Sequence, residues 1–322
     1  MSDAVNEDFF SVSLTPTSRF CFASVEDGRA YLQKSDEFSQ HMTPLERAAR
    51  MRLTRPVSER EFLAFVAESV CAWEAEEVRT IGVVAQNIGQ RLEELQLCFP
   101  ETILLVKTSG EEEGQSSYTR GAAIMLPPAK LDYTPATLER LLVHELFHVL
   151  SRSLPALREA LYQEIGFQFC GEIAFPPVLA SRRVTNPDAP YNDHFIHLCT
   201  RGQEVDVVPI LYMTLDWKNK PYVGTFFDHI NYRFLVIERD EQGWRPRRQE
   251  NGHYQYLQTN SLERFYEQVG RNSANAHQPE EILAENFVAL VLQDPAVPSP
   301  EVVARMMDVL SRPAFRGPLA GG

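Results

Sequence analysis

The spacing of hydrophobic residues predicts helices over much of the first hundred positions. Residues from about 26 to 55 have a helical pattern, and a longer pattern runs from 58 to about 97, with a break expected near 80–82. Within the longer pattern, apolar side chains recur every three or four residues, as on one face of a helix: Phe62, Phe65, Val66, Val70 and Trp73. We interpret these side chains as part of a core.

Short apolar runs predict strands in two parts of the chain. The runs 102–107 and 121–126 are compact, and the loop 110–121 between them is polar and carries three consecutive glutamates. A second strand-rich segment extends from 205 to about 248 and contains the runs 207–212, 222–227 and 234–237, with turns at 217–221 and 240–243.

The remaining apolar patterns predict helices. One begins at Thr134 and Pro135, because threonine caps free backbone amides and proline suits the first helical position, and it is expected to end near Pro155. A helix over 156–169 follows, and then a proline-rich connection over 176–190. Three more helices are predicted near the end of the chain, over 262–269, 280–293 and 302–311.

This order of elements predicts an α+β fold. We expect residues 1–75 to form a helical N-terminal region that packs on the core, and residues 76–322 to form one larger domain. Within the larger domain, the strand-rich segment lies between two helices that carry the candidate chemistry described below.

Composition and charge narrow the classes of partner. The chain has 322 residues, 44% of them hydrophobic, with a net charge of −13. An acidic surface disfavours nucleic acid, because phosphate binding needs clustered positive charge. We expect no membrane segment, since no apolar run approaches the roughly 18 residues that a spanning helix needs. Oligomeric state cannot be inferred from these features.

The first residues and the cysteines bear on cellular location. The start of the chain, Met1 to Asp8, is acidic and has neither the basic residues nor the apolar stretch of a signal peptide. The five cysteines are scattered and form no Cys-x-x-Cys pair. We expect a reduced, cytoplasmic protein, and export by a route that needs no cleaved signal is compatible with the same features.

The segment His144-Glu145-Leu146-Phe147-His148 is the strongest functional signal in the chain. Two histidines four residues apart lie on one face of a helix, so both rings can reach one metal ion. Glu145 points to nearly the same side and brings a carboxylate beside a metal-bound water. The surrounding helix is apolar and hence buried, and burying these polar groups is costly unless they have partners. The pattern predicts one zinc ion per chain, held by His144 and His148, with Glu145 as the catalytic base.

A catalytic zinc ion usually has a third protein ligand. A histidine six residues after His148 would supply it in one zinc peptidase group, but this chain has Leu154 there. Glu281 and Glu285 stack on one face of a later helix, where two carboxylates repel each other unless a cation is near. We therefore predict that Glu281 binds zinc and that Glu285 accepts a hydrogen bond from a ligand histidine.

Alternatives for the third ligand are Glu280, Glu285 and His277. Glu280 and Glu281 also have a simpler explanation, because acids in the first turn of a helix are favoured by the helix dipole and need no metal. If Glu281 is the zinc ligand, the loss of Glu280 should leave zinc affinity near that of the unmodified chain.

The combination of His-Glu-x-x-His with a later Glu-x-x-Ala-acid helix resembles the gluzincin group of zinc metallopeptidases. The resemblance is carried by His144, Glu145, His148, Glu281 and Glu285 and covers two helices. It implies a zincin-like core in which an edge strand borders the cleft and pairs with extended substrate. It also implies a tyrosine or histidine that stabilises the oxyanion, for which His277 is a candidate.

These features predict a zinc-dependent metallohydrolase, with a peptide or protein as its substrate. Glu145 would take a proton from the attacking water and return it to the leaving amine. Two alternatives use the same site: an amidase or deformylase that acts on a small molecule, and a non-catalytic binding module that zinc stabilises. A third hypothesis is a secreted or injected effector that cuts one host protein.

Overall fold

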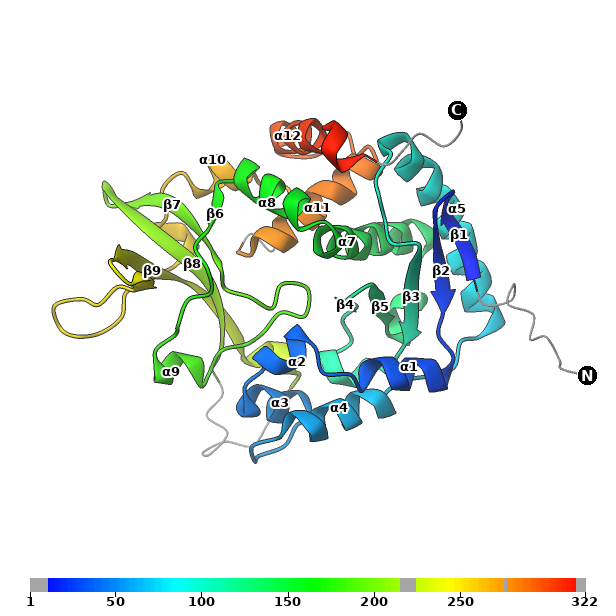
Figure 1. Ribbon diagram of the computed structural model, residues 1–322, viewed down its shortest axis with the longest axis horizontal. Coiled ribbons are helices and arrows are strands. Elements are labelled where there is room, and N and C mark those ends of the chain that lie inside the picture. Colours follow the sequence, from blue (N-terminus) through cyan, green and yellow to red (C-terminus); the bar gives the residue numbers. More distant parts are fainter. Residues whose placement is uncertain (1–10, 215–223, 275–276, 317–322) are drawn as a thin grey trace, which may run out of the picture.

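Two β-sheets, each covered by helices, organise the molecule (Figure 1). The computed structural model describes residues 11–214, 224–274 and 277–316. Its mixture of helices with largely separate strands confirms the predicted α+β class. None of the helices in these described ranges is both long and apolar enough to cross a membrane.

The first sheet has five strands in the order β1-β2-β3-β5-β4. Their bounds are Ser11–Thr15 for β1, Ser18–Phe22 for β2, Thr102–Lys107 for β3, Tyr118–Arg120 for β4 and Ala123–Leu126 for β5. Strands β2, β3 and β5 are parallel neighbours, whereas β4 is antiparallel to β5 and lies at the edge of the sheet. The prediction for 102–107 is confirmed, and 123–126 matches most of the second predicted strand.

The alternation of side chains along β3 divides the core between the two faces of this sheet. Ile103 and Leu105 face the larger cluster, which contains residues of α5 (Ala75–Leu95) and α7 (Pro135–Ser153). Leu104 and Val106 face the opposite side, toward the N-terminal helices. Those helices are α1 (Val25–Leu32), α2 (Glu37–His41), α3 (Pro44–Arg50) and α4 (Glu59–Glu68).

Two expectations for the N-terminal part were wrong. Residues 1–75 were expected to be helical, but residues 11–22 form β1 and β2, which join the central sheet through β3. The break expected near 80–82 lies instead between α4 and α5, at residues 69–74. There the backbone bonds to the end of β3, from Cys71 N to Lys107 O at 2.8 Å, which a continuous helix could not do.

Gly89 shows how closely α5 lies against β1. A Cβ atom at this position would be 2.1 Å from the carbonyl oxygen of Leu14, far inside van der Waals contact. Glycine is thus required where the helix meets the strand backbone.

The second sheet has the order β10-β9-β8-β7-β6, and all its pairs are antiparallel. The bounds are Phe167–Phe169 for β6, His194–Thr200 for β7, Gln203–Met213 for β8, Ile230–Asp240 for β9 and Gly243–Pro246 for β10, with β11 (Tyr256–Leu257) paired to β9. The predicted strand 222–227 is not found in its described part, where the 3-10 helix Phe226–His229 begins. The turn expected at 217–221 lies outside the described residues.

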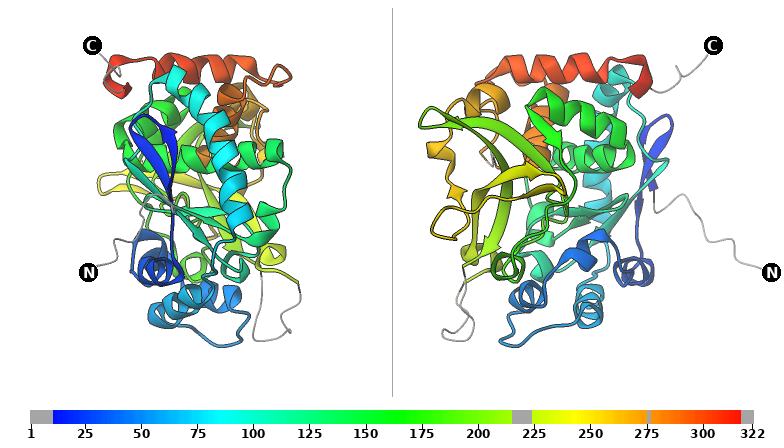
Figure 2. Two further views of the ribbon diagram at one scale, coloured as in Figure 1. Left: turned by 90° about the vertical axis from the view of Figure 1, so that its right-hand side faces the viewer. Right: turned by 60° about the vertical axis from the view of Figure 1, so that its left-hand side comes forward.

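The later helices pack over both sheets. They are α6 (Pro128–Leu131), α8 (Pro155–Glu164), α9 (Pro177–Ala180), α10 (Phe265–Val269), α11 (Pro279–Val291) and α12 (Pro300–Leu310). Figure 2 shows α12 at one end of the molecule and the helices α1–α4 at the opposite end. Between these ends α7 packs against α11, so residues far apart in the sequence meet at their contact.

Candidate metal centre

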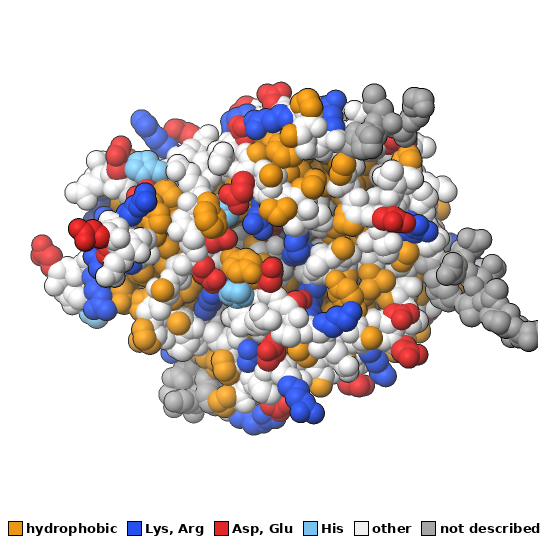
Figure 3. All heavy atoms as spheres, in the orientation of Figure 1, with side chains coloured by type: hydrophobic (Ala, Val, Ile, Leu, Met, Phe, Trp, Pro, Cys, Tyr) orange, Lys and Arg blue, Asp and Glu red, His pale blue; other side chains and the backbone are white. Residues whose placement is uncertain are grey.

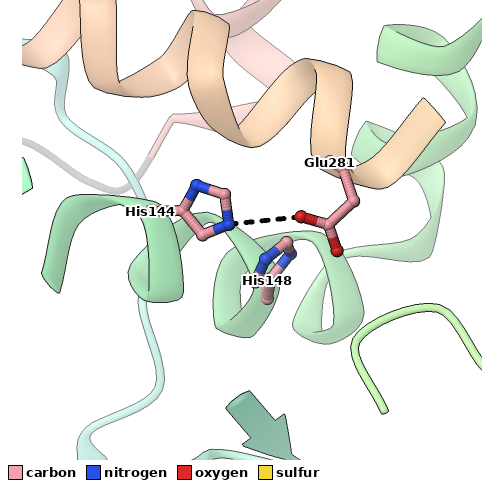
Figure 4. A group of neighbouring side chains, drawn as sticks. All are labelled: His144, His148 and Glu281. Carbon is pink, nitrogen blue, oxygen red and sulfur yellow. Dashed lines mark ion pairs between the residues drawn. The ribbon is translucent and has the colours of Figure 1, made fainter. Parts of the chain in front are cut away.

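Helix α7 presents both histidines toward α11. It begins at Pro135, with the Thr134 side chain accepting a hydrogen bond from Thr137 N, as the sequence predicts. The rings of His144 and His148 lie one turn apart, with centroids separated by 4.8 Å. Figure 4 shows both rings and the Glu281 carboxylate pointing into one space between the two helices.

The geometry of His144, His148 and Glu281 fits one tetrahedral metal ion. One ligand atom from each lies within 4.8 Å of the other two, and His144 Nε2 is 3.3 Å from Glu281 Oε2. Two atoms that each lie ~2.1 Å from a shared tetrahedral zinc ion are separated by roughly 3.4 Å. Two imidazoles and one carboxylate also form a donor set that is typical of a hydrolytic zinc site.

Carboxylates fix the orientation of both imidazole rings through their Nδ1 atoms. Glu285 Oε1 lies 3.0 Å from His144 Nδ1, the contact that the sequence predicts. Glu280 Oε1 lies 3.1 Å from His148 Nδ1. Both rings therefore turn Nε2 toward the proposed ion, since the other nitrogen is engaged.

Glu280 lies in the first turn of α11, where an acid suits the helix dipole, but its side chain also makes specific contacts. Its side chain is 2% exposed, and its second oxygen accepts hydrogen bonds from Tyr162 Oη at 2.7 Å and Ser151 Oγ at 2.9 Å. A carboxylate with this many partners holds His148 in place. Removal of Glu280 should therefore lower zinc affinity.

Glu145 is buried in the wall of the site with one oxygen engaged and the other not. Ser117 Oγ donates to Glu145 Oε1 at 2.6 Å. Glu145 Oε2 is buried and has no hydrogen-bond partner among the described residues. Such an orphaned oxygen is costly unless a polar ligand is bound beside it, which fits a base that receives a proton from water.

Asp188 is a further acidic residue at this site that the sequence did not indicate. One of its carboxylate oxygens lies within 4.8 Å of ligand atoms of both Glu145 and His148. It is held by the edge strand, since Thr119 N and Thr119 Oγ1 both donate to Asp188 Oδ1, at 2.8 and 2.6 Å.

Charge at the centre is dominated by carboxylates. Burial raises the pKa of Glu145 to about 7, and the charge of Asp188 acts in the same direction. Burial alone would lower the pKa of His148, but Asp188 and Glu280 raise it to about 9. His144 also has a pKa well above its ordinary value, because Glu281 and Glu285 outweigh its burial. The surroundings thus favour positive charge, which protons or a metal ion can supply.

A cleft of about 600 Å³ opens above these residues. Its walls come from α7, α11, the segment before β4 and the start of β9, and include His144, Glu145, Asp188, Glu281 and Glu285. This volume lies within the range of ordinary ligand sites. On the face of the molecule drawn in Figure 3, acidic and basic side chains are intermixed, and the described residues there form no continuous basic surface.

His277, the candidate oxyanion stabiliser, also lines this cleft. Its ring stacks on that of Tyr232, with centroids 4.3 Å apart and an interplanar angle of 16°. Burial lowers its pKa, and the charge of Glu281 opposes this shift. Its role as an oxyanion stabiliser stays a prediction.

Sequence patterns could not have indicated Ser117, Asn186 or Asp188 as parts of the site. Asn186 Nδ2 donates to Glu281 Oε1 at 2.8 Å and so orients the predicted ligand. Asn186 and Asp188 flank Pro187 in a stretch interpreted only as a loop. Polar residues beside a proline are common in turns, and their local sequence does not say that the turn reaches a metal centre.

Comparison with known proteins finds no matching family model, no matching curated protein and no matching solved structure. The resemblance to gluzincins therefore rests on residues of α7 and α11 alone, and both membership of that group and a zincin-like core stay predictions.

Proposed function

We propose that this chain is a zinc-dependent metallohydrolase that cleaves peptide bonds. The observation that carries the proposal is the convergence of His144, His148 and Glu281 beside Glu145, whose free carboxylate oxygen is buried. Bound zinc would supply Lewis acidity, which lowers the pKa of water and polarises a carbonyl group.

The chain's own residues would transfer the proton and orient the ligands. Ser117 holds one oxygen of Glu145, so the other is left to take a proton from the attacking water and deliver it to the leaving nitrogen. A pKa near 7 suits a group that must both accept and donate a proton at neutral pH. Glu280 and Glu285 keep the two imidazoles in a fixed orientation, which reduces reorganisation when substrate binds.

A catalytic site is favoured over a structural zinc site by the number of ligands. Structural zinc sites are closed by four protein ligands, whereas a catalytic ion keeps a position open. Among the described residues, His144, His148 and Glu281 place three ligand atoms together, and two of these residues, His144 and Glu281, line the cleft.

A peptide is favoured over a small amide by the edge strand. Ser116 and Ser117, just before β4, and Tyr118, its first residue, line the cleft. An extended substrate can form backbone hydrogen bonds with this segment ahead of Thr119. The amidase or deformylase alternative would use the same centre without this pairing.

The substitution Glu145→Gln tests the proposal. It preserves size and the hydrogen bond from Ser117 but removes the basic oxygen, so zinc content should stay at one ion per chain while turnover falls by about 10²- to 10⁴-fold. Zinc would be counted by elemental analysis, and turnover followed on a peptide library by mass spectrometry. Full turnover in the variant would overturn the role of Glu145, and a zinc-loaded wild type that cuts no peptide but hydrolyses small amides would favour the alternative.

A further inference from the structure

One wall of the cleft is formed by residues 184–188, which belong to the segment 184–190 that we call the strap. Its first part is tied to α3, because Thr185 N donates to Glu46 Oε1 at 2.6 Å and Arg50 donates to the carbonyl oxygen of Thr185 at 3.1 Å. A separate cavity of about 50 Å³ lies behind the strap, lined in part by Asp188 and Tyr162. The strap thus divides the cleft from the interior behind it.

The strap also closes the edge of β4. The outward N–H group of Thr119, which a paired substrate strand would use, already donates to Asp188. Arg152 joins the two sides, since it donates to Thr119 Oγ1 at 2.9 Å and to the carbonyl oxygens of Pro187 at 3.1 Å and Asp188 at 3.2 Å. Figure 1 shows the segment before β7 reaching across to β4. A substrate that pairs with the start of β4 must therefore end before Thr119.

The two ends of the cleft differ in their ionisable side chains. At the closed end, the unpartnered oxygen of Glu145 lies beside the Asp188 carboxylate, on which the charges of His148 and Arg152 also act. Toward the other end, Lys130 and Arg140 line the cleft, and Arg140 also pairs with Glu285 at 3.5 Å and Asp294 at 3.6 Å. Arg140 precedes His148 by eight residues on α7, a distance of about 12 Å along the helix.

We propose that the closed end binds the free amino group of a peptide through Asp188, so that the enzyme removes the N-terminal residue. This inference rests on the proposed function, and it names the substrate class for that site. An ammonium group is a cation with three donors, which matches a carboxylate that is already fixed by Thr119. The basic side chains at the other end suit the remainder of the peptide, which runs toward its carboxyl terminus.

The reaction is an ordinary hydrolysis. The water oxygen forms a bond to the carbonyl carbon of the first residue, and the bond from that carbon to the second residue's nitrogen breaks. Glu145 takes one proton from water and gives it to the departing nitrogen. The products are one amino acid and a peptide shortened by one residue.

Substrate pairs test the proposal in the wild-type chain. Tripeptide amides that begin with Leu, Phe or Arg would be supplied to the zinc-loaded protein with a free amino group or with an N-acetyl group. We expect cleavage after the first residue, and a kcat/KM at least about 100-fold lower for the acetylated peptides, because Asp188 would then face an uncharged group. Equal cleavage of both forms, or cleavage only inside longer peptides, would overturn the proposal.

Two matched variants test whether Asp188 causes the preference for peptides with a free amino group. Asp188→Asn keeps the acceptor for Thr119 but removes the charge. Because Asp188 also lies beside Glu145 and His148, its loss can lower turnover of every peptide, so the diagnostic quantity is the ratio of kcat/KM for free peptides to that for acetylated peptides, which should fall by about 100-fold. Asp294→Asn is the matched control, because it removes a carboxylate charge that lies 3.6 Å from Arg140. It should leave kcat/KM for free and for acetylated peptides within about twofold of the wild-type values. Equal losses in the two variants would contradict a specific role for Asp188. The melting temperature and zinc content of each variant exclude misfolding.

A binding measurement separates this inference from the proposed function. Calorimetry on the Glu145→Gln variant would compare the free and acetylated Leu tripeptide amides without turnover. Tighter binding of the free form by about tenfold or more supports recognition of the amine even if no hydrolysis is found, and equal affinity overturns it. Cleavage of acetylated peptides that is lost in Glu145→Gln would retain the hydrolase and reject only the amine site.

Discussion

At the scale of single residues, the candidate metal centre is a set of paired contacts rather than three isolated side chains. Each imidazole has a carboxylate at Nδ1 and turns Nε2 toward the proposed ion, with Glu285 at His144 and Glu280 at His148. The adjacent glutamates at the start of α11 thus have different contacts, because Glu281 lies against His144 at the proposed metal site and Glu280 bonds to Tyr162 and Ser151. Helical spacing placed Glu281 and Glu285 on one face, and the gluzincin resemblance gave them different roles, but neither assigned a partner to Glu280.

Substitutions at these glutamates should have graded effects on zinc affinity. Glu281→Ala removes a ligand and should weaken binding most. Glu280→Gln and Glu285→Gln should weaken it by about 10- to 100-fold, since each alters the hydrogen bond to a ligand imidazole. Titration against a competing chelator measures all three. An unchanged zinc affinity in Glu280→Gln would mean that this residue acts through the helix dipole and not through His148.

The raised pKa values of the histidines predict that zinc competes with protons. With a pKa of about 9, His148 is about nine-tenths protonated at pH 8, whereas an unperturbed histidine of pKa ~6.5 would be nearly neutral. Zinc binding at pH 8 should therefore release protons, and apparent affinity should rise as pH increases toward 9.

The same shifts set the pH dependence of stability in the zinc-free chain. Because the pKa of His148 is higher in the folded chain than in the unfolded chain, protonation of His148 stabilises the fold. This stabilisation is complete below the unfolded pKa of about 6.5 and is lost as the pH rises through about 9. Zinc-free protein should thus lose thermal stability between pH 6.5 and 9. For the zinc-binding prediction, calorimetry in buffers of different ionisation enthalpy counts the protons that are released when zinc binds. A count near zero at pH 8 would contradict the raised pKa values of the histidines.

At the scale of elements, a buried ion network connects the N-terminal helices to the strap. Arg50 of α3 donates to Glu46 at 2.6 Å and to Glu113 at 2.7 and 2.9 Å, and its side chain is 1% exposed. The same guanidinium reaches Thr185 of the strap and lies over the ring of Phe226, 4.1 Å from its centroid. The N-terminal region therefore takes part in shaping the cleft wall.

Removing Arg50 should destabilise the chain strongly. Arg50→Ala leaves the buried Glu46 and Glu113 without their cation, which costs about 3 to 5 kcal/mol. Arg55→Ala is the matched control, because Arg55 pairs with Glu61 at 2.6 Å but is 57% exposed, and such surface pairs contribute little. Urea unfolding of both variants measures the difference. Comparable small losses would show that the network does not hold the strap.

Elements with a strong local signal were predictable. The capping Thr134 and the proline after it located the start of α7, and the apolar run 102–107 gave β3 without error. The break between α4 and α5 was misplaced, because it depends on bonds from residue 71 to the distant β3. Local spacing does not contain that pairing.

At the scale of the whole molecule, the topology brings the site together. The order β1-β2-β3-β5-β4 leaves β4 at the edge nearest α7, and a loop between β6 and β7 closes that edge with Asp188. The 132 positions between His148 and Glu281 contain all six strands of the second sheet, and the contact between α7 and α11 brings these two residues together. Sequence reasoning predicted the residues on those two helices, but the strap's place in the site follows from tertiary contacts.

The central claim is that zinc binds at His144 Nε2, His148 Nε2 and Glu281, with Glu145 beside it. Diffraction from zinc-loaded crystals, recorded at the zinc absorption edge, tests this directly. We predict one anomalous peak per chain, with the ion at about 2.0–2.2 Å from each of the three atoms and Glu145 outside the ligand set. A peak bounded by Glu145, His148 and Asp188, or no peak between α7 and α11, would contradict the account.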